Sequence, residues 1–205
     1  METKIVLYGA SGHGKVIADI LNYQKDIELI FIDDSPKLEN VLQFPVFNRN
    51  ALNLDTHSQL IISVGNNRVR KNIVSRLQVS YARAIHHSAV ISSYSTVDEG
   101  TVVMAGVLVN PNVKVGKHCI LNTGSIIEHD CLISDFVHVS PGVSLAGNVS
   151  IGEGTHVGIG STIIQNVTVG KWATIGAGAV VLKDVPDYAV VVGNPGKIIK
   201  FNSIQ

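Results

Sequence analysis

The chain has neither an excess of charge of one sign nor a long apolar segment. Its 205 residues carry sixteen basic and sixteen acidic side chains, so the formal net charge is zero. A balanced chain of this kind has no general electrostatic attraction to nucleic acid or to an anionic membrane. No segment reaches the roughly 18 uninterrupted apolar residues that a membrane-spanning helix needs. We therefore expect no nucleic-acid partner and no membrane insertion.

Two further features of a secreted protein are missing. The first residues, METKIVLYGA, lack a cationic stretch followed by a long apolar run, which is unlike a signal peptide. Cysteine is scarce, and both cysteines, Cys119 and Cys131, occupy the small phase of the repeat described next. We expect them to be small buried side chains rather than disulfide partners or metal ligands. The chain is predicted to be cytoplasmic and to need no metal.

The main feature that is present is a six-residue repeat that continues from residue 91 to residue 181 without an insertion. Sixteen aliphatic residues recur at one phase: Ile91, Val97, Val103, Val109, Val115, Leu121, Ile127, Ile133, Val139, Leu145, Ile151, Val157, Ile163, Val169, Ile175 and Val181. Four residues after each one stands a small or β-branched residue, beginning with Ser95 and ending with Val185. A fixed short period of this kind indicates a β-solenoid, in which no rung buries its apolar face alone.

The first 82 residues follow a different pattern. Apolar runs at residues 4–8, 27–32 and 60–64 predict strands, and apolar residues at helical spacing predict helices over 13–23 and 68–77. Strands that alternate with helices are typical of a small parallel α/β sheet of the Rossmann-like kind. We therefore expect one domain at residues 1–82 and the solenoid domain at 83–205.

Two segments show neither pattern. Residues 35–57 contain Pro36 and Pro45 and are predicted to be irregular. The chain after Pro186 keeps neither periodicity, although residues 193–196 (GNPG) predict a turn and 197–201 a closing strand.

A glycine-rich turn follows the first predicted strand, from Gly9 through Ser11 to Gly14. Such a turn presents backbone N–H groups and a helix N-terminus to an anion, usually a phosphate. The spacing is G-x-x-G-x-G and not G-x-G-x-x-G, which disfavours an NAD-dependent oxidoreductase. Asp33 and Asp34 end the second strand, where such folds bind a ribose or a base. Together these residues favour a nucleotide with a pyrophosphate over a purely structural turn, and His13 either contacts the phosphate or is a tolerated polar residue.

Three histidines of the repeat are separated by their phase. His138 and His156 occupy the outward strand position and lie eighteen residues apart, so they stack on one face if three hexads make a rung. His118 falls at a turn and is expected to be a solvated side chain.

His129 stands at a corner of the solenoid between Glu128 and Asp130. A carboxylate bonded to one imidazole nitrogen fixes the tautomer and raises the basicity, so the other nitrogen can accept a proton. Gly147 occupies the same phase one rung later, and we expect its missing side chain to leave room for a ligand. These residues make His129 the candidate general base, against the alternative of a polar corner residue.

Several segments together resemble one family. They are YGASGHGKV, FIDD, IIEHD, HVSPG, IGAGAVV and the closing VGNPGK. In this combination the whole chain resembles the PglD/NeuD-like family of hexapeptide-repeat sugar acetyltransferases. The resemblance implies a left-handed parallel β-helix and a homotrimer with active sites between subunits. It also implies direct transfer of acetyl from acetyl-CoA to an amino or hydroxyl group of a sugar.

The resemblance also implies roles for single residues. His129 matches the catalytic base and Asp130 the acidic neighbour that raises its basicity. Contacts to the nucleotide sugar match the glycine turn and the strand ends, at Gly9, Ser11, Gly12, His13, Gly14, Asp33, Asp34 and Gly65. Contacts to acetyl-CoA in the groove between neighbouring solenoids match His138, Gly147, Ile159 and Ala177.

The expected activity is N-acetylation of a nucleotide-linked 4-amino-4,6-dideoxy sugar. UDP is preferred because the Asp33–Asp34 pair resembles the uridine-binding version of the family. Alternatives are a GDP-perosamine or dTDP-amino-sugar N-acetyltransferase, an O-acetyltransferase of sialic acid or CMP-sialic acid, and a non-catalytic nucleotide-sugar-binding scaffold.

Overall fold

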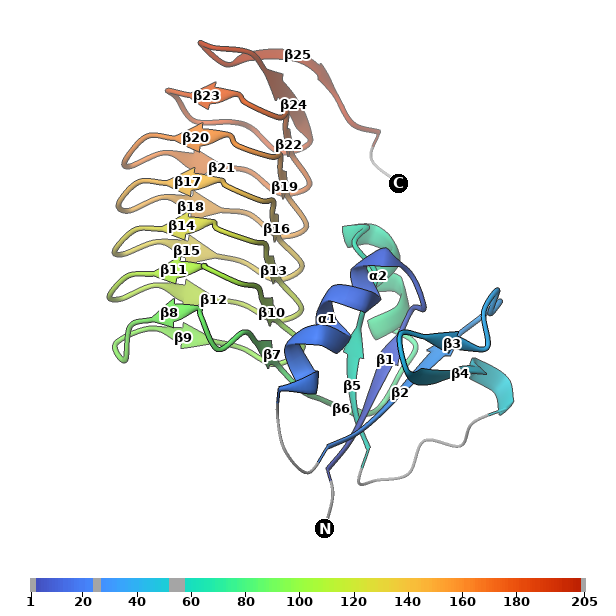
Figure 1. Cartoon of the computed structure of the whole chain (residues 1–205). Helices are drawn as coiled ribbons and strands as arrows, with labels where there is room; N and C mark the ends of the chain where they lie inside the picture. The colour runs from blue at the N-terminus through green and yellow to red at the C-terminus, as the bar shows by residue number, and fades with distance from the viewer. Residues whose placement is uncertain (1–2, 24–26, 52–57, 204–205) are drawn as a thin grey trace.

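The computed structural model describes residues 3–23, 27–51 and 58–203, which form an α/β part and a solenoid packed side by side (Figure 1). Within these ranges, no helix is long and apolar enough to cross a membrane. The first solenoid strand, β7, begins three residues after the last strand of the α/β sheet, β6.

The α/β part is built on a six-stranded sheet with the order β3-β4-β2-β1-β5-β6. Its central strands run parallel, which confirms the predicted α/β sheet. The principal elements are β1 (Thr3–Tyr8), α1 (Gly12–Asn22), β2 (Ile27–Asp33), β5 (Gln59–Ile62), α2 (Asn67–Val74) and β6 (Ser80–Tyr81). Helix α1 buries Ile17 and Leu21 against the sheet and against the first strands of the solenoid, so one apolar cluster joins the two parts.

The prediction of irregular structure for residues 35–57 is wrong for part of that segment. It contains β3 (Asn40–Val41), β4 (Phe44–Asn48) and the short 3-10 helix η1 (Arg49–Ala51). Pro45 is compatible with β4 because the parallel ladder to β2 begins only at the next residue, Val46. Residues 52–57 lie outside the described ranges.

The solenoid is a parallel β-helix with three faces, which confirms the predicted fold (Figure 1). Face 1 contains β7 (Ala84–Ile85), β10 (Val102–Val103), β13 (Ile120–Leu121), β16 (His138–Val139), β19 (His156–Val157), β22 (Thr174–Ile175), β24 (Ala189–Val192) and β25 (Lys197–Phe201). Face 2 contains β8 (Val90–Ile91), β11 (Leu108–Val109), β14 (Ile126–Ile127), β17 (Ser144–Leu145), β20 (Thr162–Ile163) and β23 (Val180–Val181). Face 3 contains β9 (Thr96–Val97), β12 (Lys114–Val115), β15 (Leu132–Ile133), β18 (Ser150–Ile151) and β21 (Thr168–Val169).

Each rung comprises three hexads, because paired strands are eighteen residues apart, as in Ile120↔His138. The large and small phases of the repeat together fill one continuous core. Both cysteines belong to that core as free thiols, as predicted. We name the turns between strands by the faces they join: corner 1–2, corner 2–3 and corner 3–1.

The end of the chain extends the solenoid further than the sequence pattern indicates. Strand β24 pairs in parallel with β22 on face 1, although the hexad period is lost after Pro186. The predicted turn at 193–196 and the closing strand are confirmed, since β25 folds back antiparallel to β24.

Candidate active site

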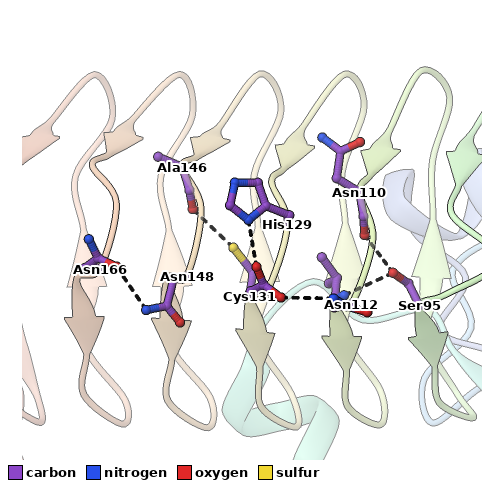
Figure 2. Close-up of polar contacts among 10 residues, drawn as sticks. Ser95, Asn110, Asn112, His129, Cys131, Ala146, Asn148 and Asn166 are labelled. Carbon is purple, nitrogen blue, oxygen red and sulfur yellow. Dashed lines mark hydrogen bonds and ion pairs between the residues drawn. The ribbon is translucent and has the colours of Figure 1, made fainter.

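A histidine–carboxylate pair stands on corner 2–3, between β14 and β15. Nδ1 of His129 lies 2.8 Å from Oδ2 of Asp130, and both side chains are more than half exposed to solvent (Figure 2). Asp130 adopts a left-handed backbone conformation with φ of 62°. Asparagine and aspartate tolerate that conformation better than most residues, so the corner fixes where the carboxylate projects.

A second donor reaches the same carboxylate from the rung before. Nδ2 of Asn112 lies 3.2 Å from Oδ1 of Asp130. The hydrogen bond to His129, followed by the hydrogen bond from Asn112, lowers the pKa of Asp130. The carboxylate therefore stays charged and holds His129 by Nδ1, which leaves Nε2 for proton transfer. Sequence reasoning missed Asn112, although counting back eighteen residues from Asp130 finds it.

Gly147 lies directly over His129, as the eighteen-residue period predicts. The expectation that it leaves an open space for a ligand is wrong, because the imidazole itself fills that space. A Cβ built on Gly147 would lie 2.6 Å from Cε1 and 2.8 Å from Nε2 of His129. The glycine therefore accommodates the ring. Among the described residues, the backbone N–H of Gly147 has no hydrogen-bond partner.

The glycine turn and the two aspartates meet at the carboxyl edge of the α/β sheet, as expected. Both oxygens of Asp33 accept backbone hydrogen bonds, one from Ala10 at 3.0 Å and one from Ser35 at 2.9 Å. Asp34 accepts a hydrogen bond from the Tyr8 hydroxyl, and burial with this neighbouring carboxylate raises the pKa of Tyr8 to about 12. Asp33 thus holds the turn, and among the described residues one oxygen of the Asp34 carboxylate has no hydrogen-bond partner and is available to a ligand.

The residues of the glycine turn serve different purposes. Gly9 has φ of 120°, and Gly14 packs so closely on the Gly9 carbonyl that a Cβ would lie 2.6 Å from its oxygen. Both are required by the backbone. Gly12 by contrast has open space around it, and Ser11 at the N-cap of α1 makes no side-chain capping bond. These two residues and the first N–H groups of α1 are the part of the turn that faces outward.

A pocket between the α/β part and face 1, here called the crevice, is lined by Gly65, Arg68, His156 and Thr174 among others. Histidines from both parts of the chain meet beside it. His138 and His156 lie one above the other on face 1, as predicted, with their rings edge-on and their centroids 4.9 Å apart, and His13 approaches His138 at 6.4 Å. Nε2 of His13 and Nδ1 of His138 are buried without a partner among the described residues. Burial, together with neighbouring positive groups, lowers the pKa of His13 to about 4 and that of His138 to about 3. Two neutral imidazoles are therefore buried beside this crevice.

Arg70 of α2 connects the two parts and was not predicted. It is almost completely buried. Its guanidinium donates to the carbonyls of Val64, Gly65, His118 and Phe136 and to the side chain of Asn67. This cation also contributes to the lowered pKa of His13, His138 and His156. No sequence period indicates such a residue.

The expectation that His118 is solvated is wrong. Its side chain is 3% exposed, stacks on Phe136 and lies edge-on to Tyr81. Helix α2 and strand β6 cover corner 3–1, and a turn residue under that cover cannot reach solvent.

The predicted acetyl-CoA contacts fall into two groups. His138 is on face 1, and the exposed residues Ile159 and Ala177 are on the neighbouring corner 1–2. Gly147 is with His129 on corner 2–3, which forms the edge of the solenoid opposite the α/β part in Figure 1. A single chain therefore does not bring His129 to the crevice. Among the described residues, no group of three or more His, Cys, Asp or Glu side chains could hold a metal ion.

Comparison with known proteins identifies the family. The family described as PglD N-terminal domain matches residues 4–77, and bacterial transferase hexapeptide (six repeats) matches residues 148–183. The acetyltransferase domain of PglB from Neisseria gonorrhoeae is 37% identical, with a TM-score of 0.92 over 96% of this chain and 100% of that one. The chain belongs to the PglD-like family of hexapeptide-repeat sugar acetyltransferases.

Two further relatives of the chain have names that state a sugar substrate. PerB from Caulobacter crescentus, solved with CoA and GDP-perosamine, is 35% identical with a TM-score of 0.90, covering 96% of this chain and 97% of that one. The UDP-N-acetylbacillosamine N-acetyltransferase of Bacillus subtilis (strain 168) is 39% identical over 110 residues, which are 49% of this chain and 51% of that protein. The chain is thus an acetyl-CoA-dependent sugar N-acetyltransferase.

Proposed function

We propose that this enzyme acetylates the 4-amino group of a nucleotide-linked 4-amino-4,6-dideoxy sugar, UDP-linked in the first instance, with His129 as general base. The observation that carries the proposal is the His129–Asp130 pair, bonded at 2.8 Å on an exposed corner. Its carboxylate stays charged, and Nε2 of the imidazole has no partner among the described residues.

The chemistry assigned to the pair is direct transfer between two bound substrates. The sugar amine attacks the thioester carbonyl, a C–N bond forms, and Nε2 of His129 takes the proton that the amine loses. The tetrahedral intermediate then collapses, the C–S bond breaks, and the imidazolium returns the proton to the CoA thiolate. The unpartnered N–H of Gly147 is the proposed donor to the oxyanion, beside the ring that moves the proton.

An acyl-cysteine intermediate does not fit the positions of the thiols. Cys119 and Cys131 are buried in the solenoid core, and burial raises the pKa of each. A buried, protonated thiol is a poor nucleophile, which supports direct transfer.

The acceptor site needs a second copy of the chain. The crevice with His13 and His138 adjoins face 1, whereas His129 is on the corner opposite. Face 2 lies between corner 1–2 and corner 2–3, and its outward residues Val90 and Leu108 are exposed and apolar. We propose a homotrimer in which these faces adjoin neighbouring chains, so that one chain's His129 meets its neighbour's crevice. Sedimentation equilibrium tests the trimer.

The nucleotide is assigned to the glycine turn and Asp34. Ser11, Gly12 and the start of α1 suit the pyrophosphate, and the sugar is assigned to the crevice, beside which Nε2 of His13 is buried without a partner among the described residues. Asp33 is occupied by two backbone donors, so the base is recognised by Asp34 rather than by both aspartates. One carboxylate can accept from uracil or from guanine. GDP-perosamine is accordingly the second candidate, and the likeness to PerB favours it.

A panel of UDP-, GDP-, dTDP- and CMP-linked sugars with acetyl-CoA tests the proposal, with released CoA measured by a thiol reagent. We expect turnover with a nucleotide-linked 4-amino sugar and none with the corresponding 4-hydroxy sugar. Turnover of free sugars alone would contradict the role of the α/β part, and turnover of CMP-sialic acid would favour O-acetylation. No turnover with any acceptor would favour a binding scaffold.

The role of His129 is tested separately with His129→Gln. Because the side chain is largely exposed, we expect unchanged folding and a kcat lower by roughly 100-fold or more. Near-normal turnover in this variant would contradict the assignment of the base.

A further inference from the structure

Corner 2–3 carries a ladder of amide side chains with one interruption. Asn112, Asp130, Asn148 and Asn166 stand one rung apart, and all have φ between 58° and 64°. Nδ2 of Asn148 donates to Oδ1 of Asn166 at 3.0 Å, and Nδ2 of Asn112 donates to Oδ1 of Asp130 at 3.2 Å (Figure 2). In each pair the donor side chain therefore bonds to the side chain one rung later. Asp130 departs from this pattern because its other oxygen bonds to His129.

The two pairs of the ladder do different things. The bond from Asn148 to Asn166 joins two neutral side chains. Asn148 reaches His129 through the backbone, its N–H donating to the His129 carbonyl at 2.9 Å, and does not bond to the imidazole. The bond from Asn112 reaches a carboxylate whose second oxygen is 2.8 Å from an imidazole. An amide fixed on one oxygen restricts rotation of the carboxylate, and that rotation decides whether the other oxygen faces Nδ1 of His129. Backbone support also holds Asn112 in place, since Ser95 bonds to the backbone of Asn110 and Val113 on either side.

We infer that Asn112 is a positioning residue, which acts through Asp130 to hold His129 in the tautomer with the proton on Nδ1. This inference rests on the proposed role of His129 as base. Asn112 stands one rung before the pair, and within the described residues its amide donates to the Asp130 carboxylate alone.

The ladder offers a matched pair of substitutions. Asn112→Asp replaces a donor by a carboxylate that faces the carboxylate of Asp130, and two such groups repel each other. Asn166→Asp makes the same chemical change at the same backbone conformation, but position 166 accepts a hydrogen bond and a carboxylate still accepts it. Asn112→Gly adds a variant that removes the amide while retaining the left-handed conformation.

Two measurements on the intact enzyme separate the inference from the proposed function. The first is ¹⁵N NMR of histidine-labelled protein without substrates, with the His129 signals identified by their loss in His129→Gln. The second is steady-state kinetics. We expect both Asn112 variants to lower the fraction of His129 protonated on Nδ1. We also expect kcat to fall about tenfold in Asn112→Asp and about threefold in Asn112→Gly, with KM unchanged. Asn166→Asp should alter neither measurement.

Each other outcome decides one of the two ideas. If the Asn112 variants leave the His129 tautomer as in the wild type, or Asn166→Asp shifts it equally, the inference about Asn112 is wrong. If the tautomer shifts and kcat does not change, Asn112 does position the pair and His129 is not the base. Thermal unfolding of each variant confirms that the comparison is made on folded protein.

Discussion

The substitution Gly147→Ala is expected to displace the candidate base without disturbing the fold. The added Cβ would lie 2.6 Å from Cε1 of His129, whereas ordinary contact begins near 3.4 Å, so the imidazole must move by about 0.8 Å. It then cannot keep its 2.8 Å bond to Asp130 in the present geometry. A misplacement of about 1 Å costs on the order of 100-fold in rate. We therefore expect kcat to fall by roughly 100-fold.

Stability should change little in this variant. The backbone of Gly147 is outside the left-handed region, so alanine is not strained there, and the atoms that must move belong to an exposed side chain. We expect the free energy of unfolding to change by less than about 0.5 kcal/mol. CoA release measured with a thiol reagent reports kcat, and urea unfolding reports the stability.

Gly106→Asn is the control, because a Cβ there meets no atom closer than 3.8 Å and asparagine tolerates its φ of 68°. It should keep kcat close to the wild-type value. A kcat for Gly147→Ala within threefold of wild type would refute the reasoning, since the imidazole would then not need its present position. Loss of folding in Gly147→Ala would contradict the packing argument instead.

Three further perturbations are predicted. Asp130→Asn keeps a corner residue suited to φ of 62° but removes the negative charge beside His129. We expect kcat to fall roughly 10- to 100-fold with unchanged thermal unfolding, and a kcat equal to that of the wild type would contradict the role of the carboxylate. Arg70→Met deprives four carbonyls of their donor and should lower the free energy of unfolding in urea by about 3 kcal/mol, and a loss below 1 kcal/mol would show that the two parts do not depend on it. Burial, with Arg70 and His156 nearby, lowers the pKa of His13 to about 4 and that of His138 to about 3. Below pH 6.5 the unfolded chain therefore binds protons at these histidines that the folded chain does not bind. Stability should therefore fall from pH 6.5 towards pH 4 in thermal unfolding, and a flat profile would exclude buried neutral imidazoles.

The features that depend on the repeat could be predicted from the sequence. The six-residue period gives the strands, the eighteen-residue period gives the rungs, and together they stack His138 on His156 and place Gly147 over His129. These predictions succeed because a side chain in a solenoid takes its environment from its phase and from the rungs above and below.

The features that depend on how the α/β part covers the solenoid could not be predicted. Phase indicates that His118 and His138 point away from the core, but only the packing of the α/β part determines that His118 is buried and His138 half-buried. Arg70 bonds to carbonyls 48 and 66 residues away, and no period relates them. The spacing could not predict what fills the space over His129, because that depends on the rotamer of the imidazole ring. The cytoplasmic location and the left-handedness of the β-helix stay predictions.

The uniform corners of the solenoid have a consequence for where a proton-transfer group can stand. Successive rungs are separated by about 4.8 Å, the spacing of hydrogen-bonded strands, and four successive rungs share the left-handed residue at corner 2–3, from Asn112 to Asn166. The pair at residues 129 and 130 can therefore occupy only discrete heights along the prism, of which position 147 with position 148 is the next. The height of the base relative to the crevice, which Arg70 holds in place, can therefore change only by whole rungs. A sequence change can move the base by one step or leave it where it is, and no intermediate height is available.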